Sequence, residues 1–147
     1  MNLNEDGILD RKIFVDLSAN PVAKVGRKAA NPAENPAITL GGIGVQQNHA
    51  RFETTGERTT LIPESAEALG FIYVNGEKLI NMAPRELKPN DRIIFGTGTV
   101  MLYRCQNRDS EVELHDTPEN PITYEYAMTE KGRIENAAEE RAQEEAR

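Results

Sequence analysis

The chain has 147 residues, of which 38% are hydrophobic and 28% charged, and its formal net charge is −7. This composition is typical of one soluble globular domain, and no run approaches the ~18 apolar residues that a membrane span requires. An acidic chain without a broad basic stripe is a poor nucleic-acid binder, so we expect protein partners. The first residues have neither a basic start nor an apolar core, which argues against a signal peptide and makes the cytoplasm the default location.

The first part of the chain is predicted to be a polar lead-in followed by a hairpin. Residues 1–11 are polar and are expected to lie over the surface or at a domain entry. Residues 12–17 predict the first strand, and Asn20-Pro21 then turns the chain into a second strand at 22–27. Residues 28–36 hold two Asn-Pro pairs, which push the preceding residue away from helix, so this stretch is predicted to be an exposed loop.

A Gly- and amide-rich turn joins the next two strand signals. Residues 37–40 are β-prone, and residues 49–54 alternate apolar with charged side chains, as does a strand with one buried face. The turn can expose backbone N–H groups at one end of a sheet, which is where a rigid scaffold usually carries its binding residues. Its polar side chains are those of Gln46, Gln47, Asn48 and His49.

The middle of the chain predicts two hairpins separated by a loop. A strand at 58–62 follows the short turn at 55–57, and residues 63–70 are predicted to be loop. Asn75-Gly76 tolerates the positive φ angles of a type I′ turn and is flanked by strand formers. Residues 71–80 therefore predict a hairpin.

The last predicted strands complete an all-β pattern. A turn-rich stretch at 84–91 precedes strands at 92–95 and 99–104, which have few polar interruptions, as expected when both faces are covered in a sandwich. Residues 12–105 show no alternation of strands with helices. The predicted fold is a β-sandwich of about ten or eleven short strands, with a C-terminal helical extension.

The composition changes after Cys105, for which we expect a packing role only. The predicted organisation is a lead-in at 1–11, the sandwich at 12–106, a polar linker at 107–120 and the helical extension at 121–147.

The extension begins with a signal for a helix start. Asn120 is predicted to be the N-cap, with Pro121 in the first helical position and with Ile122 and Tyr126 on one face. Ile134 belongs to a thin apolar stripe with Ala138 and Ala142, which is compatible with the start of a coiled coil. An isolated helix of this kind is expected to fray.

Four motifs, in this order and at this spacing, resemble the forkhead-associated (FHA) domain. They are Val25-Gly26-Arg27, the stretch 44–50, Tyr73-Val74-Asn75-Gly76, and Leu87 with the stretch 91–96. The flanks resemble those of the FHA domain in kinesin-3 motors. Residues 2–6 are similar to the segment that leads into that domain, residues 122–127 to the helix start that follows it, and the loop at 28–36 is an insertion.

This resemblance implies a non-enzymatic protein-interaction module of a larger, cytoplasmic motor on the microtubule cytoskeleton. ATP and Mg²⁺ would belong to a motor domain outside these residues, and the sequence holds no Gly-rich phosphate loop with Lys and Ser or Thr. The implied partners are neighbouring coiled-coil segments and cargo adaptors, with roles in autoinhibition or dimerisation. Whether the extension at 121–147 forms a homodimer or leaves a monomer stays open.

The resemblance also implies a phosphate site, which this chain matches in part. In FHA domains that read phosphothreonine, an Arg beside a Gly and a Ser of the central turn hold the phosphate, and an Asn ahead of the later Asn-Gly turn holds the peptide backbone. Arg27 matches the first, Gln46 stands where the Ser would be, and Gly70-Phe71 lacks the Asn. The two losses remove roughly 2–4 kcal/mol of recognition. The alternative function is a phosphothreonine reader that uses Arg27 with substitute amides from Gln46, Gln47 and Asn48.

The basic side chains around Arg27 leave two interpretations open. With Lys24, Lys28 and Arg51 it forms a positive patch for acidic or phosphorylated segments, or these residues are ordinary solvated surface charges, since exposed ion pairs are common and weak.

Four residues are assigned structural roles in turns: Gly26, His49, Asn75 and Gly76. The resemblance implies that His49 braces its turn through hydrogen bonds. A lone His without Cys, His or Asp at ligand spacing is rarely a metal ligand. The sequence offers no Ser-His-Asp, Cys-His or paired-carboxylate arrangement, so we expect no catalytic, metal or cofactor site.

Overall fold

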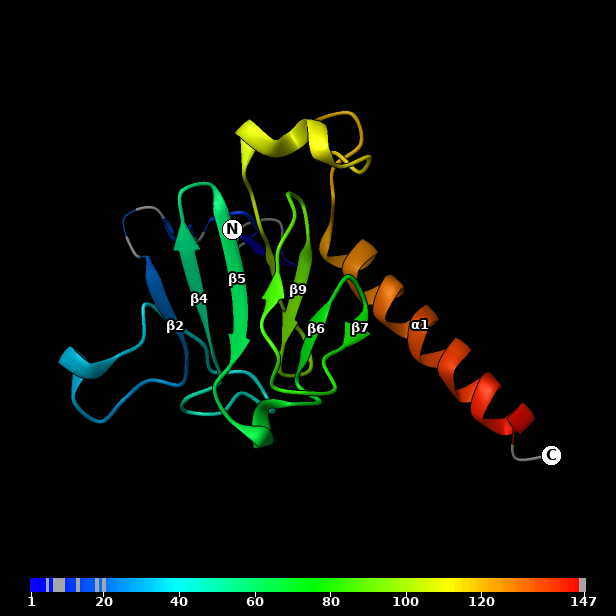
Figure 1. The fold of residues 1–147 in the computed structure, drawn as a ribbon, viewed down its shortest axis with the longest axis horizontal. Coiled ribbons are helices and arrows are strands. Elements are labelled where there is room, and N and C mark those ends of the chain that lie inside the picture. Colours follow the sequence, from blue (N-terminus) through cyan, green and yellow to red (C-terminus); the bar gives the residue numbers. More distant parts are fainter. Residues whose placement is uncertain (5, 7–9, 13, 18, 20, 146–147) are drawn as a thin grey trace.

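Two β-sheets stack face to face, and one long helix crosses the outer face of one of them (Figure 1). The computed structural model describes residues 1–4, 6, 10–12, 14–17, 19 and 21–145. In this part of the chain, ten strands form two five-stranded sheets, here called sheet A and sheet B. The helix is α1 (Tyr124–Glu145), which runs away from the sandwich toward the C-terminus (Figure 1).

Sheet A is antiparallel throughout. Its order is β1 (Asn2–Leu3), β10 (Thr99–Leu102), β9 (Arg92–Phe95), β6 (Ile72–Val74) and β7 (Glu77–Lys78). Sheet B has one parallel pair, between its first two strands. Its order is β3 (Ile38–Thr39), β2 (Val22–Gly26), β4 (Ala50–Thr55), β5 (Arg58–Pro63) and β8 (Arg85–Glu86). Short 3₁₀ helices lie in the connections at Pro32–Glu34, Ala66–Ala68 and Gln106–Glu111.

The core has two apolar clusters on the two faces of sheet A. The first lies between the sheets, where Phe52 of β4 meets Phe95 of β9 edge to face at 6.1 Å between ring centroids. The second covers the outer face, where Tyr73 and Ile94 pack with Ile122 and Ala127. β9 and β10 are therefore covered on both faces, as their apolar sequences predict, but the outer cover is α1 with its lead-in.

The all-β sandwich with a C-terminal helix is confirmed, and the Asn75-Gly76 hairpin forms as predicted. Asn75 has φ 53° and Gly76 φ 85°, the two positive angles of a type I′ turn. The structure adds a strand at Arg85–Glu86, in a stretch for which the sequence predicts only turns. The strand pairs with β5 over two residues only, and these two residues are too few to show the alternating apolar pattern that predicts a strand.

The strand expected at 12–17 is wrong for the described residues, which have irregular backbone. The hairpin with 22–27 is wrong too, since β2 pairs with β4 and β3. The start of the lead-in pairs with a sheet instead: Asn2 pairs with Met101, and Leu102 N donates to Met1 O at 2.7 Å, so these residues take the edge of β10. The expectation that the lead-in lies over the surface is thus wrong at its start, where Leu3 is buried.

The helix begins later than its sequence signal indicates. The Oγ1 atom of Thr123 accepts a hydrogen bond from Tyr126 N at 3.1 Å, so Thr123 caps a helix that starts at Tyr124, and the expected cap at Asn120 is wrong. Ile122 is held outside the helix because its N–H donates to Asp116 and its carbonyl accepts from Arg11. The stripe predicted through Ala138 and Ala142 lies outside the side chains that the structure describes.

Candidate functional site

The turn at 41–49 is braced from inside by His49. Its ring is fully buried, with Nδ1 accepting from Gln46 N at 3.0 Å, which leaves the proton on Nε2 to be donated to Phe71 O at 3.0 Å. Burial lowers the pKa of His49, and the hydrogen bond to the Phe71 carbonyl opposes this only in part. The ring is therefore neutral near neutral pH, and it joins the turn to the connection before β6.

Arg27 lies at the end of β2 and binds the same turn. Its Nε donates to Val45 O at 2.6 Å and its Nη2 to Gly42 O at 2.9 Å. The preceding Gly26 has to lack a side chain here, because a Cβ would lie 1.9 Å from the carbonyl oxygen of Gln47. Two N–H groups of the Arg27 guanidinium thus donate to backbone carbonyls of the protein itself, although the residue as a whole is exposed.

A pocket of about 450 Å³ brings some of the predicted binding residues together and leaves others out. It is lined by Arg27, Gln47 and Asn48, together with Lys24 of the expected positive patch. The insertion at 28–36 supplies part of the wall.

The same pocket contains two carboxylates that the sequence does not place there. Glu34 comes from the insertion and Glu64 from the residue after β5, so two acidic side chains line the pocket together with Lys24 and Arg27. Like charges at short range disfavour an anionic ligand, so these carboxylates weaken the site for phosphate.

The remaining candidates lie outside this pocket. Gln46 is half-buried and its Nε2 donates to Gly44 O at 3.3 Å. Arg51 pairs with Glu53 at 2.9 Å and with Glu64 at 3.2 Å, and these hydrogen bonds raise its pKa. Lys28 is exposed. Of the four basic residues, Lys24 and Arg27 line the pocket, and Arg51 is paired with acidic side chains.

The Asn75-Gly76 turn lies against α1, which sequence reasoning did not foresee. The Asn75 side chain donates to Asp91 Oδ1 at 3.0 Å and accepts from Arg92 N at 2.9 Å, which fixes the turn on β9. A Cβ on Gly76 would lie 2.8 Å from Ile134 Cδ1 and 2.9 Å from the carbonyl oxygen of Glu130. The glycine is thus needed for its backbone angles and for the close approach of the helix.

An ion pair buried under α1 fastens the helix to sheet A. Arg92 donates from Nε and Nη2 to the two carboxylate oxygens of Glu130, at 3.1 and 2.6 Å, and both side chains are 10% exposed. Its third donor, Nη1, binds Asn90 O at 2.9 Å. The guanidinium also lies 5.5 Å from the centre of the Tyr126 ring. The sequence does contain a signal for this pair. Arg92 is the first residue of an otherwise apolar strand, and a charged side chain that is buried there needs a partner of opposite charge.

A second contact of the helix comes from the next residue, Lys131. Lys131 Nζ is 4.7 Å from the ring centre of Tyr73 and 3.3 Å from Glu135. Burial, followed by a hydrogen bond to Glu135 and its charge, raises the pKa of Tyr73 to about 12.

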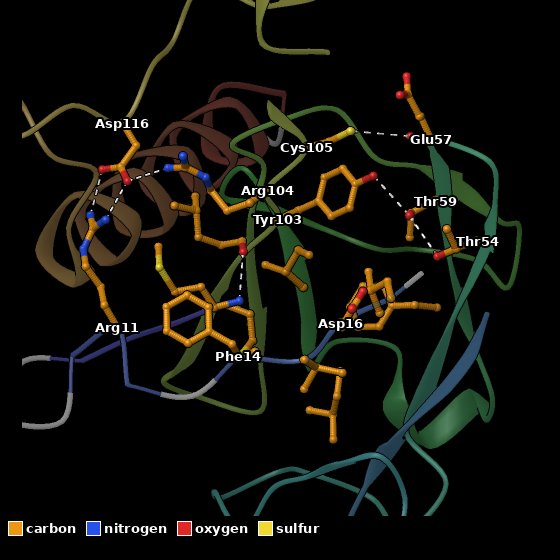
Figure 2. A pocket seen from close by; sticks show the side chains of 18 of the residues that line it. Arg11, Phe14, Asp16, Thr54, Glu57, Thr59, Tyr103, Arg104, Cys105 and Asp116 are labelled. Atoms are coloured by element: carbon orange, nitrogen blue, oxygen red, sulfur yellow. Dashed lines mark hydrogen bonds and ion pairs between the residues drawn. The ribbon is translucent and has the colours of Figure 1, made fainter. Parts of the chain in front are cut away.

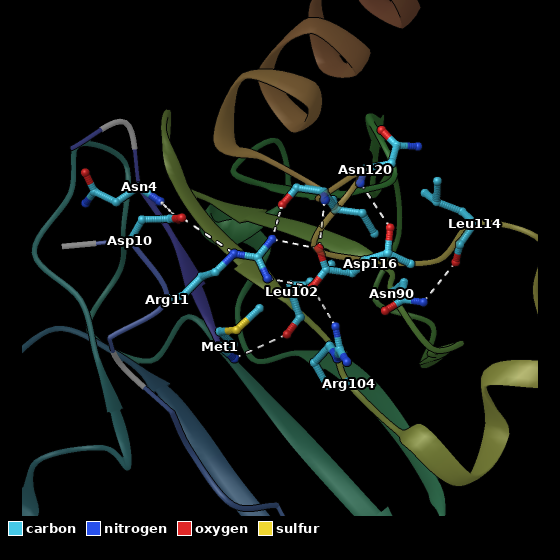
Figure 3. A network of polar contacts seen from close by, with 12 residues as sticks. Met1, Asn4, Asp10, Arg11, Asn90, Leu102, Arg104, Leu114, Asp116 and Asn120 are labelled. Carbon is cyan, nitrogen blue, oxygen red and sulfur yellow. Dashed lines mark hydrogen bonds and ion pairs between the residues drawn. The ribbon is translucent and has the colours of Figure 1, made fainter. Parts of the chain in front are cut away.

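A third polar group, shown in Figure 3, holds the lead-in and the residues before α1 together. The Asp116 side chain accepts two hydrogen bonds from Arg11, at 2.5 and 2.7 Å, and one from Arg104 at 2.6 Å. The hydrogen bonds from Arg11 lower the pKa of Asp116 despite its burial. We call this group the Asp116 clip.

Among the described residues, no group of His, Cys, Asp and Glu side chains is arranged to hold a metal ion. No helix in this part of the chain is long and apolar enough to cross a bilayer.

The sequence profile of the FHA domain matches residues 23–96. The kinesin-like protein KIF28 of Rattus norvegicus is 31% identical over 111 residues, which cover 70% of this chain and 9% of that protein. KIF28 of Mus musculus is 34% identical over 107 residues, with the same shares. The chain thus spans about a tenth of the length of these relatives.

Solved structures share the fold at low sequence identity. One comes from a study of phosphothreonine-dependent FHA domain interactions; it is 18% identical, the TM-score is 0.52, and the match covers 71% of this chain and 94% of that one. The yeast Dun1 FHA domain, solved with a doubly phosphorylated peptide, is 17% identical, with a TM-score of 0.51 over 82% of this chain and 86% of that one.

Proposed function

The chain belongs to the FHA domain family, and on that premise we propose that it is a non-enzymatic protein-interaction module of a kinesin-like microtubule motor. Its partners are neighbouring coiled-coil segments of the motor, in autoinhibition or dimerisation, and cargo adaptors. In this proposal ATP hydrolysis belongs to a motor domain elsewhere in the parent protein, and the module works in the cytoplasm on microtubules.

The observation that carries this proposal is the fastening of α1 to the sandwich. Three contacts hold the first half of α1 against the sandwich, and together they fix the direction of the helix. They are the ion pair of Glu130 with Arg92, the packing of Ile134 and Glu130 against Gly76, and the contact of Lys131 with Tyr73. The second half continues past the sandwich (Figure 1). A rigid base with a projecting helix is suited to start a coiled coil.

A truncation that ends the chain at Glu135 tests this proposal. It keeps the contacts with Gly76, Tyr73 and Arg92 and removes only the projecting part of the helix. We expect sedimentation velocity to show concentration-dependent association of the 147-residue chain and its loss in the truncated chain, with similar thermal midpoints. Equal sedimentation of the two chains would reject the dimerisation role.

The second candidate function is the phosphothreonine reader, which the pocket beside Arg27 favours. Gln47 and Asn48 line this pocket and offer amide donors near the guanidinium. Against it count the two acidic side chains of Glu34 and Glu64 and the engagement of Arg27 with Val45 and Gly42.

Peptide binding separates the two functions. A phosphothreonine peptide library and its unphosphorylated twin are titrated against the chain and against Arg27→Ala. The leading proposal expects no preference for phosphate. A phosphate-dependent affinity that falls at least tenfold in Arg27→Ala would establish the reader instead.

A further inference from the structure

A large apolar cavity lies between the two sheets, and side chains that line it are shown in Figure 2. Its volume is about 880 Å³, within the range of protein ligand pockets. Sheet B contributes Ile38 and Phe52, and sheet A contributes Ile93 and Met101. The cavity is partly open to solvent, so its apolar wall is in contact with water, and an apolar occupant would remove that surface from water.

The polar groups on its wall already have partners. The Tyr103 hydroxyl donates to Thr59 Oγ1 at 3.1 Å, and the Thr59 hydroxyl lies 3.0 Å from that of Thr54 (Figure 2). At the far side, Arg104 is engaged with Asp116. An apolar occupant would leave none of these groups unpaired, whereas a polar one would find few free donors among them.

An apolar side chain of this same chain lies at the rim. Phe14 lines the cavity, yet 68% of its surface is exposed. Val15 and Leu17 line the same cavity and are partly buried against the core. Three residues before Phe14, Arg11 is anchored by Asp116, so the Cα atom of Phe14 stays within about 10 Å of the Cα atom of Arg11.

We propose that this cavity receives the Phe14 ring, and that residues 14–17 form a strap that closes the end of the sandwich in solution. The exposed aromatic surface and the apolar cavity wall are both removed from water by this one movement. The Asp116 clip holds the start of the strap, so closing requires no change in β1 or sheet A. With the ring outside, the cavity admits an apolar group from elsewhere; with the ring inside, it is closed.

Tryptophan fluorescence tests the position of the ring, because the chain contains no Trp. Phe14→Trp introduces one reporter, and Ile80→Trp, at a residue 84% exposed and away from the cavity, is the matched control. We expect the Phe14→Trp emission to be blue-shifted and its acrylamide quenching at least threefold weaker than in the control. Equal emission and quenching in the two variants would overturn the proposal.

A smaller residue provides a second test, in case a Trp ring is too large for the cavity. Phe14→Ala should bind the dye 1-anilinonaphthalene-8-sulfonate with several-fold higher fluorescence than the unmodified chain, because the vacated cavity then admits it. Unchanged dye fluorescence, at an unchanged thermal midpoint, would also overturn the proposal. Neither readout depends on peptide binding or on association, so this inference and the proposed function fail separately.

Discussion

The turn at 41–49 and the α1 face of sheet A both rely on an arginine with several bonds, but they use it differently. Arg27 binds backbone carbonyls of the adjacent turn, Val45 and Gly42. Arg92 binds the carboxylate of Glu130, 38 residues farther along the chain. The first arrangement stabilises one loop and leaves little free for a ligand. The second joins two distant parts of the chain and depends on a charge pair held away from water.

The largest effect is expected from breaking that pair. Glu130→Ala leaves Arg92 buried without its partner and should lower the free energy of unfolding by about 4 kcal/mol, as removing one member of a buried pair does. Urea unfolding measures this. The double variant Arg92→Met/Glu130→Met should recover most of the loss. Arg58→Gln, in an exposed pair with Glu86, is the control and should cost no more than about 0.5 kcal/mol. A similar loss in both single variants would mean that burial of the pair is unimportant.

The close approach of α1 can be tested at Gly76. Gly76→Ala places a methyl group against Ile134 and Glu130 and forces a non-glycine residue to φ 85°, which together should cost about 3 kcal/mol. Gly56→Ala separates the two causes, since Gly56 also has a positive φ of 63° but has no atom within 4 Å of the added Cβ. It should cost only about 1 kcal/mol. Equal losses in denaturant would show that the helix does not press on the turn.

The Asp116 clip adds a pH dependence to the α1 side of the molecule. Because hydrogen bonds lower the pKa of Asp116, its contribution is complete above its ordinary value of 3.8 and disappears as the pH falls through the lower pKa of the folded state. Asp116→Asn should cost about 2 kcal/mol at neutral pH and flatten the loss of stability below about pH 4. Thermal melts between pH 2 and 7 check this, with the exposed Glu119→Gln as control. If Asp116→Asn lost stability below about pH 4 as steeply as the unmodified chain, this prediction would be wrong.

The smallest effect is expected at the turn. Arg27→Ala removes two hydrogen bonds at an exposed site and should lower stability by about 1 kcal/mol, while Lys28→Ala should have no measurable effect. Denaturant unfolding of both variants gives the comparison. Unchanged stability of Arg27→Ala would show that the turn at 41–49 does not depend on the two hydrogen bonds of Arg27. The guanidinium could then be released to bind a ligand.

The predicted strands were most accurate where turn chemistry and side-chain alternation agreed, as at the Asn75-Gly76 hairpin and at β4 and β5. They failed at 12–17, where an apolar run has strand propensity but β2, its predicted partner, pairs with β4 and β3 instead. The helix start failed for a similar reason. Asn120-Pro121 is a good local signal, but Asp116 and Arg11 hold Ile122 in place and move the cap to Thr123.

Part of the candidate site could likewise be predicted from the sequence, and part of it could not. The residues before and within the central turn could be located from their motif, and the structure places Arg27, Gln47 and Asn48 around one pocket. The carboxylates of Glu34 and Glu64 in that pocket come from segments with no local signal for it. Charge balance in a pocket depends on which loops meet there, and periodicity does not report that.

By itself, the amino-acid sequence determined the class of fold, most of the strands and the FHA motifs, because these depend on alternation, turn residues and spacing along a short stretch. Only the tertiary structure decided that Gly76 makes room for α1, that Arg92 meets Glu130 and that Asp116 joins Arg11 to Arg104. Each of these contacts joins residues far apart in the chain, and its strength comes from removing charge or apolar surface from water, which happens only once the sheets and the helix have packed together.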